Sequence, residues 1–385
     1  LSKQLDQLLH TEQTAQTKWQ KELARGQREE LEQKIRDYQE SKEPIIVMHD
    51  YFIDRIIQIN NKIEFFKKIN EKTKFGGGSI RGISTTEIGG GNAVNFSFCL
   101  AKLGLEVHLF TTADKIGRNI LENLFLGLLN FHLNIFDGKP GYTTSLEFMN
   151  PLTFKLESNV MISDVGDNAN FGQEKFKTMI DKNLMRDAVA VVGLNWATNL
   201  KGTSLLKYVF SNSPKSLHFI DPADIGDRAS EFCRVLIDNN DLIDILSINE
   251  NECNSLLSEL KLKNRILKGN YDCKKIKRAA QILAQEFKIP INLHTKNGVA
   301  FSNGLQSFSV SSFKLMKIYN LTGAGDSWDA ANILGYLLNL KPIERLFLAN
   351  VFAALYITHG RNLISLNKFI EFYTKMYKQS KNYLL

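Results

Sequence analysis

A carboxylate that follows two glycines at the start of an apolar segment is the most chemically suggestive feature of this chain of 385 residues. The run Thr322-Gly323-Ala324-Gly325-Asp326 leads into residues 330–338, whose apolar side chains cover nearly every face of a predicted buried helix. The first N–H groups of such a helix attract an anion such as a phosphoryl group. The glycines let the backbone approach that anion, and Asp326 can take a proton from a hydroxyl group. The run predicts a phosphate-binding turn with a general base, while a tight turn with Asp326 as an ordinary N-cap is the alternative.

A second glycine turn lies far upstream. Residues 87–95, with Gly89, Gly90 and Gly91, form a turn before an apolar helix predicted over residues 96–104 that ends at Gly104, and a predicted strand over 106–111 follows. A triple glycine on its own is also typical of a packed turn. Two such turns in one chain, each opening an apolar helix, favour a binding site.

Further motifs give the chain a family resemblance. Asn249 and Glu252 form an Asn-x-x-Glu motif, Asp54 follows the first predicted strand, residues 114–117 form an Asp-x-x-Gly step, and residues 353–360 form a helix and loop near the end. With both glycine turns, and in this order from about residue 44, the chain resembles the PfkB/ribokinase family of carbohydrate and nucleoside kinases. The resemblance implies an α/β fold, a ribokinase-like three-layer α/β/α sandwich with a small β-sheet lid.

The resemblance also implies roles for particular residues. The implied anion hole consists of Gly323, Ala324 and Gly325, with Asp326 as catalytic base. The residues implied to bind the phosphoryl acceptor are Asp54, Gly90, Gly91 and Asn95, and those implied to bind the nucleotide are Asn249, Thr295, Gly298 and Thr322. Asn249 and Glu252 are implied to hold the metal ion through water. The implied cofactor is Mg²⁺ with ATP. The implied acceptor is a hydroxyl group of a sugar, sugar acid, sugar phosphate or nucleoside.

The chain departs from the family pattern just before the anion hole. Asn320 and Leu321 stand where the family has Asp and Thr, so an acidic group beside the phosphates is lost. Activation by a monovalent cation therefore stays open. Trp328 replaces a frequent Phe and keeps an aromatic ring at that position.

The elements that must position these residues alternate between strand and helix. Apolar runs at residues 45–48, 188–194, 216–221 and 244–249 are typical of buried parallel strands, whose carboxyl ends carry ligand sites in open α/β sheets. Asp221 at one such end is either a site residue or the cap of a turn. Alternating, β-rich stretches predict lid segments near residues 54–88 and 140–164.

The chain divides near residue 43. Residues 1–43 are rich in Gln, Glu and Lys with apolar residues at helical spacing, which predicts a helical N-terminal extension, a coiled coil or a fusion segment. Residues 44–385 form the predicted kinase domain. The chain is compatible with a homodimer that forms through the lid or through the N-terminal helix.

Composition limits the partners. The net charge is +7, but the basic residues are scattered, so nucleic-acid binding is not inferred. No apolar run approaches the roughly 20 residues that cross a bilayer, and the polar N-terminus lacks a signal core, so we expect no membrane partner and a cytoplasmic protein. The four cysteines show no Cys-x-x-Cys pairing or nearby histidine pattern, which argues against a zinc site.

Three alternatives in function stay open. The chain is also compatible with a non-catalytic sugar or nucleotide sensor that recruits a partner through its N-terminal helix, with a nucleoside kinase rather than a sugar kinase, or with ADP as donor. No Walker loop with a Lys-Ser or Lys-Thr ending is present, which leaves the P-loop route to phosphoryl transfer unsupported.

Overall fold

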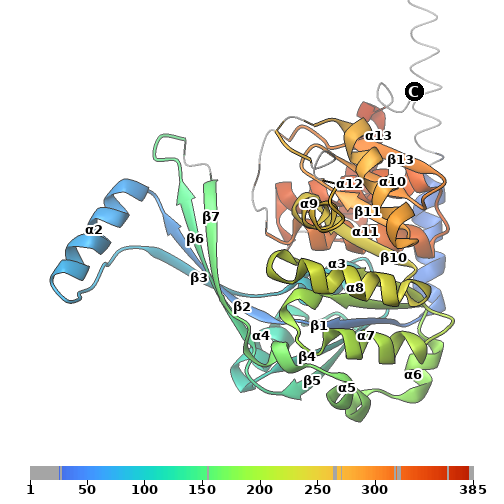
Figure 1. The fold of residues 1–385 in the computed structure, drawn as a ribbon, viewed down its shortest axis with the longest axis horizontal. Coiled ribbons are helices and arrows are strands. Elements are labelled where there is room, and N and C mark those ends of the chain that lie inside the picture. The colour runs from blue at the N-terminus through green and yellow to red at the C-terminus, as the bar shows by residue number, and fades with distance from the viewer. Residues whose placement is uncertain are drawn as a thin grey trace, which may run out of the picture.

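A computed structural model describes residue 26 and residues 28–153, 156–262, 267–269, 271–315, 318, 322–361 and 364–380. The described chain forms a layered α/β body from which a thin β-sheet arm projects (Figure 1). No helix in these ranges is both long and apolar enough to span a membrane.

A nine-stranded sheet forms the centre of the body. Its strands, in spatial order, are β13 (Ser307–Ser311), β12 (Gly298–Ser302), β11 (Ile291–His294), β10 (Ile245–Asn249), β9 (Leu217–Asp221), β8 (Ala190–Leu194), β1 (Ile45–His49), β4 (Val107–Ala113) and β5 (Phe131–Asp137). From β11 to β5 neighbouring strands are parallel, and β12 and β13 are antiparallel. Every residue of β1 and β8 is buried, as expected for parallel strands covered on both faces.

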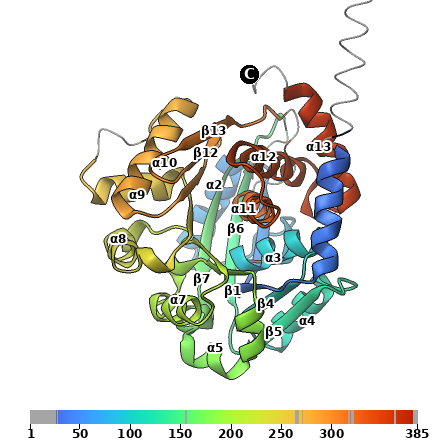
Figure 2. The ribbon, with the colours of Figure 1, turned by 90° about the vertical axis from the view of Figure 1, so that its right-hand side faces the viewer.

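Helices cover both faces of this sheet (Figure 2). One layer contains α3 (Asn92–Lys102), α4 (Lys115–Leu124), α11 (Ala324–Leu337), α12 (Pro342–His359) and α13 (Leu366–Ser380), and the other contains α5 (Gln173–Met179), α6 (Lys182–Asp187), α7 (Gly202–Ser211), α8 (Ala229–Asp238), α9 (Glu250–Glu259) and α10 (Cys273–Phe287). Short 3₁₀ helices lie at Gly166–Asn170, Trp196–Thr198, Gly226–Arg228 and Asn240–Leu242. Because strand side chains alternate, Val47 packs into one core and Ile46 into the other. The predicted three-layer α/β/α fold is confirmed.

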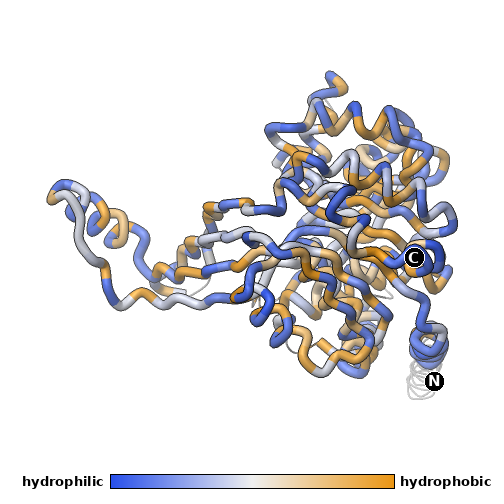
Figure 3. Tube along the Cα trace, turned by 90° about the horizontal axis from the view of Figure 1, so that it is seen from below, coloured by the Kyte–Doolittle hydropathy of each residue, from blue (hydrophilic) through white to orange (hydrophobic). Residues whose placement is uncertain are grey.

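The lid is a separate four-stranded sheet in the order β3 (Ser84–Gly90), β2 (Phe52–Ile59), β6 (Gly141–Met149) and β7 (Leu156–Asp164). Seen from below, it is a long arm that reaches away from the body (Figure 3). Helix α2 (Lys62–Lys74) lies at its tip, between β2 and β3, and contains no buried residue. The sequence interpretation did not include this helix, because its apolar residues do not pack into a core.

The N-terminal extension is described from residue 26 onward, apart from residue 27. Residues 28–41 are helical, and Leu31 and Ile35 are buried in the core that also contains α11 and α12. This part of the extension is therefore a helix docked on the body. The possible coiled coil over residues 1–25 lies outside the described residues.

Candidate active site

The glycine turn before α11 lies against α12 and α3. Gly323 is the N-cap of α11 with a φ of +82°, a conformation that L side chains rarely adopt. A Cβ atom on Gly323 would lie 2.4 Å from the hydroxyl oxygen of Tyr356 and 3.1 Å from Nδ2 of Asn95. Position 323 is therefore restricted to glycine by both backbone and space, and the start of α11 stays open to a ligand.

Asp326 lies where the two glycine turns meet. Its side chain is 8% exposed, and its carboxylate accepts hydrogen bonds from Nδ2 of Asn92 and Nδ2 of Asn95, each at 2.9 Å. Burial raises the pKa of Asp326 well above its usual value, the charges of Asp221 and Asp50 raise it further, and the two amide donors lower it. A raised pKa makes this carboxylate a stronger proton acceptor once it is ionised.

Asp50 organises the upstream glycine turn, a role that the sequence interpretation missed. Its carboxylate is fully buried and accepts hydrogen bonds from the backbone N–H groups of Asn92 (2.8 Å) and Ala93 (2.9 Å). It also accepts a hydrogen bond from Nδ2 of Asn195 at 2.9 Å. Asp50 thus holds the first turn of α3 in place, and with it the Asn92 amide that contacts Asp326.

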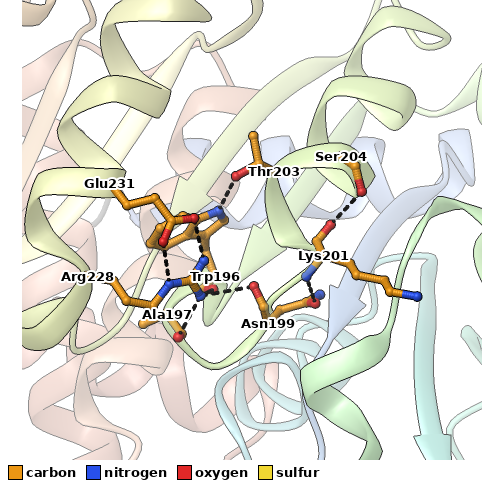
Figure 4. Close-up of polar contacts among 8 residues, drawn as sticks. All are labelled: Trp196, Ala197, Asn199, Lys201, Thr203, Ser204, Arg228 and Glu231. Atoms are coloured by element: carbon orange, nitrogen blue, oxygen red, sulfur yellow. Dashed lines mark hydrogen bonds and ion pairs between the residues drawn. The ribbon is translucent and has the colours of Figure 1, made fainter.

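Arg228 holds the turn at residues 196–199, which directly follows Asn195 in the chain. Figure 4 shows Arg228 and its contacts with this turn. Its Nη1 atom donates hydrogen bonds to the backbone carbonyls of Trp196, Ala197 and Asn199 at 2.9–3.2 Å, and its guanidinium group lies 3.9 Å from the Trp196 ring centroid. Glu231 accepts hydrogen bonds from Nε and Nη2, on another edge of the same group. One planar cation therefore holds three carbonyls of one turn, and the carbonyls of Trp196 and Asn199 also accept from the backbone N–H groups of Asn199 and Gly202.

We expect Arg228→Lys to lower the free energy of unfolding by about 2–4 kcal/mol, because lysine cannot serve the three carbonyls and Glu231 at once. Urea unfolding measures this change. Arg234→Lys, at an exposed position on helix α8, which directly follows Arg228, is the matched control and should change stability by less than about 0.5 kcal/mol. Equal stabilities of the two variants would contradict the assigned role of Arg228.

The predicted acceptor residues gather at the base of the lid. Asp54 on β2 is 9% exposed, and a Cβ atom on Gly90 would lie 1.9 Å from its Oδ2 atom. Gly91 has a φ of +99°, and a Cβ atom there would lie 3.0 Å from the Asp50 carbonyl oxygen. Nη1 of Arg361 donates to the Gly89 carbonyl at 2.7 Å and to Oδ1 of Asn95 at 3.2 Å. Small residues thus leave room for Asp54, and Arg361, which the sequence interpretation missed, ties this turn to the chain's end.

Burial raises the pKa of Asp54 to about 7, while a hydrogen bond with Thr143 and the charge of Arg361 oppose the rise. The folded state therefore retains a proton on Asp54 between about pH 4 and pH 7, where the unfolded chain has lost it. This group's contribution to stability is present at low pH and is lost as pH rises through about 7.

We expect Asp54→Asn to remove that pH dependence. Relative to the variant, the wild type should lose on the order of a few kcal/mol of unfolding free energy between pH 5 and pH 8. Urea unfolding of both proteins at the two pH values measures it, with Asp137→Asn, an exposed carboxylate, as control. Parallel pH profiles for wild type and Asp54→Asn would show that Asp54 titrates normally.

A cavity of about 390 Å³ adjoins the start of α11. Its lining includes Thr295, Ala324, Gly325, Trp328, Ala353, Ala354 and Ile357. Its volume is in the range of small-molecule sites, and its apolar wall on α12 suits a flat aromatic base. Gly298 is not among the lining residues that the structure describes; it closes the turn after β11 by hydrogen bonds with Thr295. Thr322 directly precedes Gly323.

Asn249 and Glu252 form a capping box at the start of α9. The backbone N–H of Asn249 donates to Oε2 of Glu252 at 2.8 Å, and Nδ2 of Asn249 donates to Oε1 at 2.6 Å. Glu252 is 2% exposed, and burial together with the charge of Asp221 raises its pKa well above the usual value. Asn249 also lines the 390 Å³ cavity, so the pair lies beside the predicted nucleotide site.

A second group of possible metal ligands lies next to this pair. Asp221, His294 and Asp329 each offer one ligand atom, and these atoms lie within 4.8 Å of one another. Neither Oδ2 of Asp329 nor Nε2 of His294, both buried, has a hydrogen-bond partner among the described residues. The Asp221 carboxylate also accepts from the N–H of Ala223 at 2.8 Å, so it caps the turn as the alternative interpretation predicted. The carboxylate oxygens of Asp221 and Asp329 are suitable ligands for a magnesium ion, whereas the His294 nitrogen is a poorer one.

Comparisons with known proteins show the family and the fold of the chain. A model of the pfkB family carbohydrate kinases matches residues 156–367, more than half of the chain. The adenosine kinase of Sinorhizobium meliloti superposes with a TM-score of 0.63 at 17% identity, covering 88% of this chain and 98% of that one. The ribokinase of Thermotoga maritima gives a TM-score of 0.63 at 18% identity, covering 86% and 98%. The ribokinase of Arabidopsis thaliana complexed with ribose and ATP gives a TM-score of 0.62 at 17% identity, again covering 86% and 98%.

No curated protein sequence matches the chain. The structural neighbours share the fold at low sequence identity, and the family model covers the part of the chain that contains the glycine turn before α11 and the Asn-x-x-Glu motif. The chain belongs to the pfkB family of carbohydrate kinases.

Proposed function

We propose that this kinase transfers the γ-phosphoryl group of ATP to a hydroxyl group of a sugar, sugar acid, sugar phosphate or nucleoside, with Asp326 as the general base. The observation that carries the proposal is the position of Asp326. It lies at the start of α11 between the nucleotide-sized cavity, which Ala324 and Gly325 line, and the acceptor turn, whose Asn92 and Asn95 hold its carboxylate.

In the proposed reaction the acceptor hydroxyl loses its proton to Asp326 while its oxygen forms a bond to the γ-phosphorus. The bond between that phosphorus and the bridging oxygen of ADP breaks, and ADP leaves with the electron pair. The N–H groups at the start of α11 point at the migrating group and stabilise its charge. Asp54 and Asn95 orient the acceptor, with Gly90 and Gly91 leaving room for it.

The residues that would hold the metal ion are proposed from the oxygen atoms that they offer near the glycine turn. Magnesium bound with ATP would neutralise phosphate charge. Asp221 and Asp329 offer oxygen ligands near the turn, and Asn249 and Glu252 would act through water because both oxygens of Glu252 are already hydrogen-bonded.

The test is a coupled assay of ADP release with ATP over a panel of sugars, sugar acids, sugar phosphates and nucleosides. Acceptor-dependent ADP release, with the phosphorylated product identified by mass spectrometry, is the expected result. Ligand binding by thermal shift without turnover on any acceptor would favour the sensor, and turnover with ADP but not ATP would reassign the donor.

A further inference from the structure

Three side chains of the kinds that bind metal ions lie together where β4 and β5 begin. Glu106 directly precedes β4, His108 lies on β4, and His132 lies on β5. His108 and His132 are register partners, and their rings stack with centroids 4.2 Å apart and an interplanar angle of 13°. Because side chains alternate along a strand, Glu106 and His108 share a face, and Oε1 of Glu106 contacts Nε2 of His132.

We propose that Glu106, His108 and His132 bind a divalent transition-metal ion of the zinc class. Two imidazoles and one carboxylate are a set that zinc accepts, with a fourth position left for water. One ligand atom from each residue lies within 4.8 Å of the others. Zinc–ligand bonds of about 2.0–2.2 Å require these atoms to be roughly 3.3 Å apart. Rotation of the partly exposed side chains closes that difference without moving the strands.

A simple ion pair explains less of this arrangement. A contact between Glu106 and His132 accounts for those two side chains, but it gives no function to the His108 ring that is stacked on His132. Neither ring nitrogen of His108 has a hydrogen-bond partner in the part of the chain that the structure describes. A bound cation uses all three side chains and gives the two parallel rings a common function.

The position of the site separates it from phosphoryl transfer. Asp326 and its partners lie beyond the carboxyl ends of the strands, whereas Glu106 and His108 lie at the amino end of β4. In the described sheet β5 is an edge strand whose partner is β4. A metal ion held by both strands would cross-link this edge, so the proposed role is a structural clamp. The cysteine pattern could not reveal such a site, because its ligands are imidazoles that only strand pairing brings together.

The first experiment measures metal binding by the full-length, chelator-treated protein without nucleotide. Titration with Co²⁺, followed by its visible absorption, and with Zn²⁺, followed by calorimetry, should show one ion bound per chain at this site. His108→Gln and His132→Gln should each weaken binding at least about tenfold. His359→Gln, an exposed histidine elsewhere, and His294→Gln, in the Asp221 group, should leave it unchanged. Absence of binding at 100-fold molar excess, or binding lost in His294→Gln but kept in His132→Gln, would overturn the proposal.

The second experiment tests the clamp. A saturating Zn²⁺ concentration should raise the apparent unfolding midpoint of the wild type by about 2–5 °C, because the ion binds the folded chain more tightly than the unfolded one. His132→Gln changes an exposed side chain, so its metal-free midpoint should match that of the wild type while the Zn²⁺-induced rise is lost. An equal rise in wild type and His132→Gln would place the ion elsewhere and refute the clamp.

Discussion

Asp326→Asn is expected to lower kcat by at least about 10³-fold, because the variant keeps the shape of the side chain but cannot accept the proton of the acceptor hydroxyl. The affinity for ATP and for the acceptor should change only a few-fold, since neither ligand depends on that proton transfer for binding. In the wild type, kcat should rise with pH as Asp326 loses its proton, and its raised pKa places that rise at higher pH than an ordinary carboxyl would. The measurement is kcat and KM with the best acceptor of the panel at several pH values.

The matched control is Asp114→Asn. Asp114 is the N-cap of α4 and accepts a hydrogen bond from the N–H of Gly117 at 2.7 Å, a role that asparagine fills equally well. The same chemical change there should leave kcat within about two-fold. If Asp326→Asn retained near-normal kcat while the protein remained a kinase, another group would have to take the proton.

Gly323→Ala should reduce kcat/KM by about 100-fold or more. The new Cβ atom would lie 2.4 Å from the Tyr356 hydroxyl oxygen and 3.1 Å from Nδ2 of Asn95, so either the start of α11 or these partners must move. A displacement of about 1 Å at a phosphoryl-transfer site is enough for such a loss. Steady-state kinetics measure the effect, and urea unfolding measures its cost in stability.

Two further variants separate the steric cause from the backbone cause. Gly127 has a nearly identical φ of +81°, but no atom lies within 4 Å of a Cβ atom added there. Gly127→Ala should therefore lower the free energy of unfolding by about 1 kcal/mol and leave kcat/KM unchanged. Tyr356→Phe removes the clashing hydroxyl, and combining it with Gly323→Ala should restore part of the lost kcat/KM. A double variant no better than Gly323→Ala would mean that the contact with the Tyr356 hydroxyl is not responsible for the loss.

The proposed metal clamp and the active site respond to different changes. Glu106, His108 and His132 lie at the amino ends of strands, and the kinase residues lie at the carboxyl ends. Failure of the Co²⁺ titration would therefore leave the proposed function untouched. Loss of activity in Asp326→Asn would in turn say nothing about the clamp.

The fold class, the family and the two glycine turns could all be predicted from the amino-acid sequence. Local patterns carry that information: the apolar runs of β1 and β8 follow from burial on both faces, and the glycine before α11 follows from a positive φ that other residues avoid. The Asn-x-x-Glu spacing likewise corresponds to a local capping box, because Asn249 and Glu252 are one helical turn apart.

The contacts between side chains that are distant in the chain could not be predicted, because they depend on how the elements pack together. Asp50, Asn195 and Arg361 support the site through hydrogen bonds to segments far away in the chain, and no local spacing predicts such partners. The pairing of His108 with His132 depends on the register of β4 against β5, which is set when both strands pack into the sheet. Periodicity and turn chemistry act over a few residues, whereas a carboxylate's pKa and an ion's ligands depend on neighbours that the folded chain supplies from several elements at once.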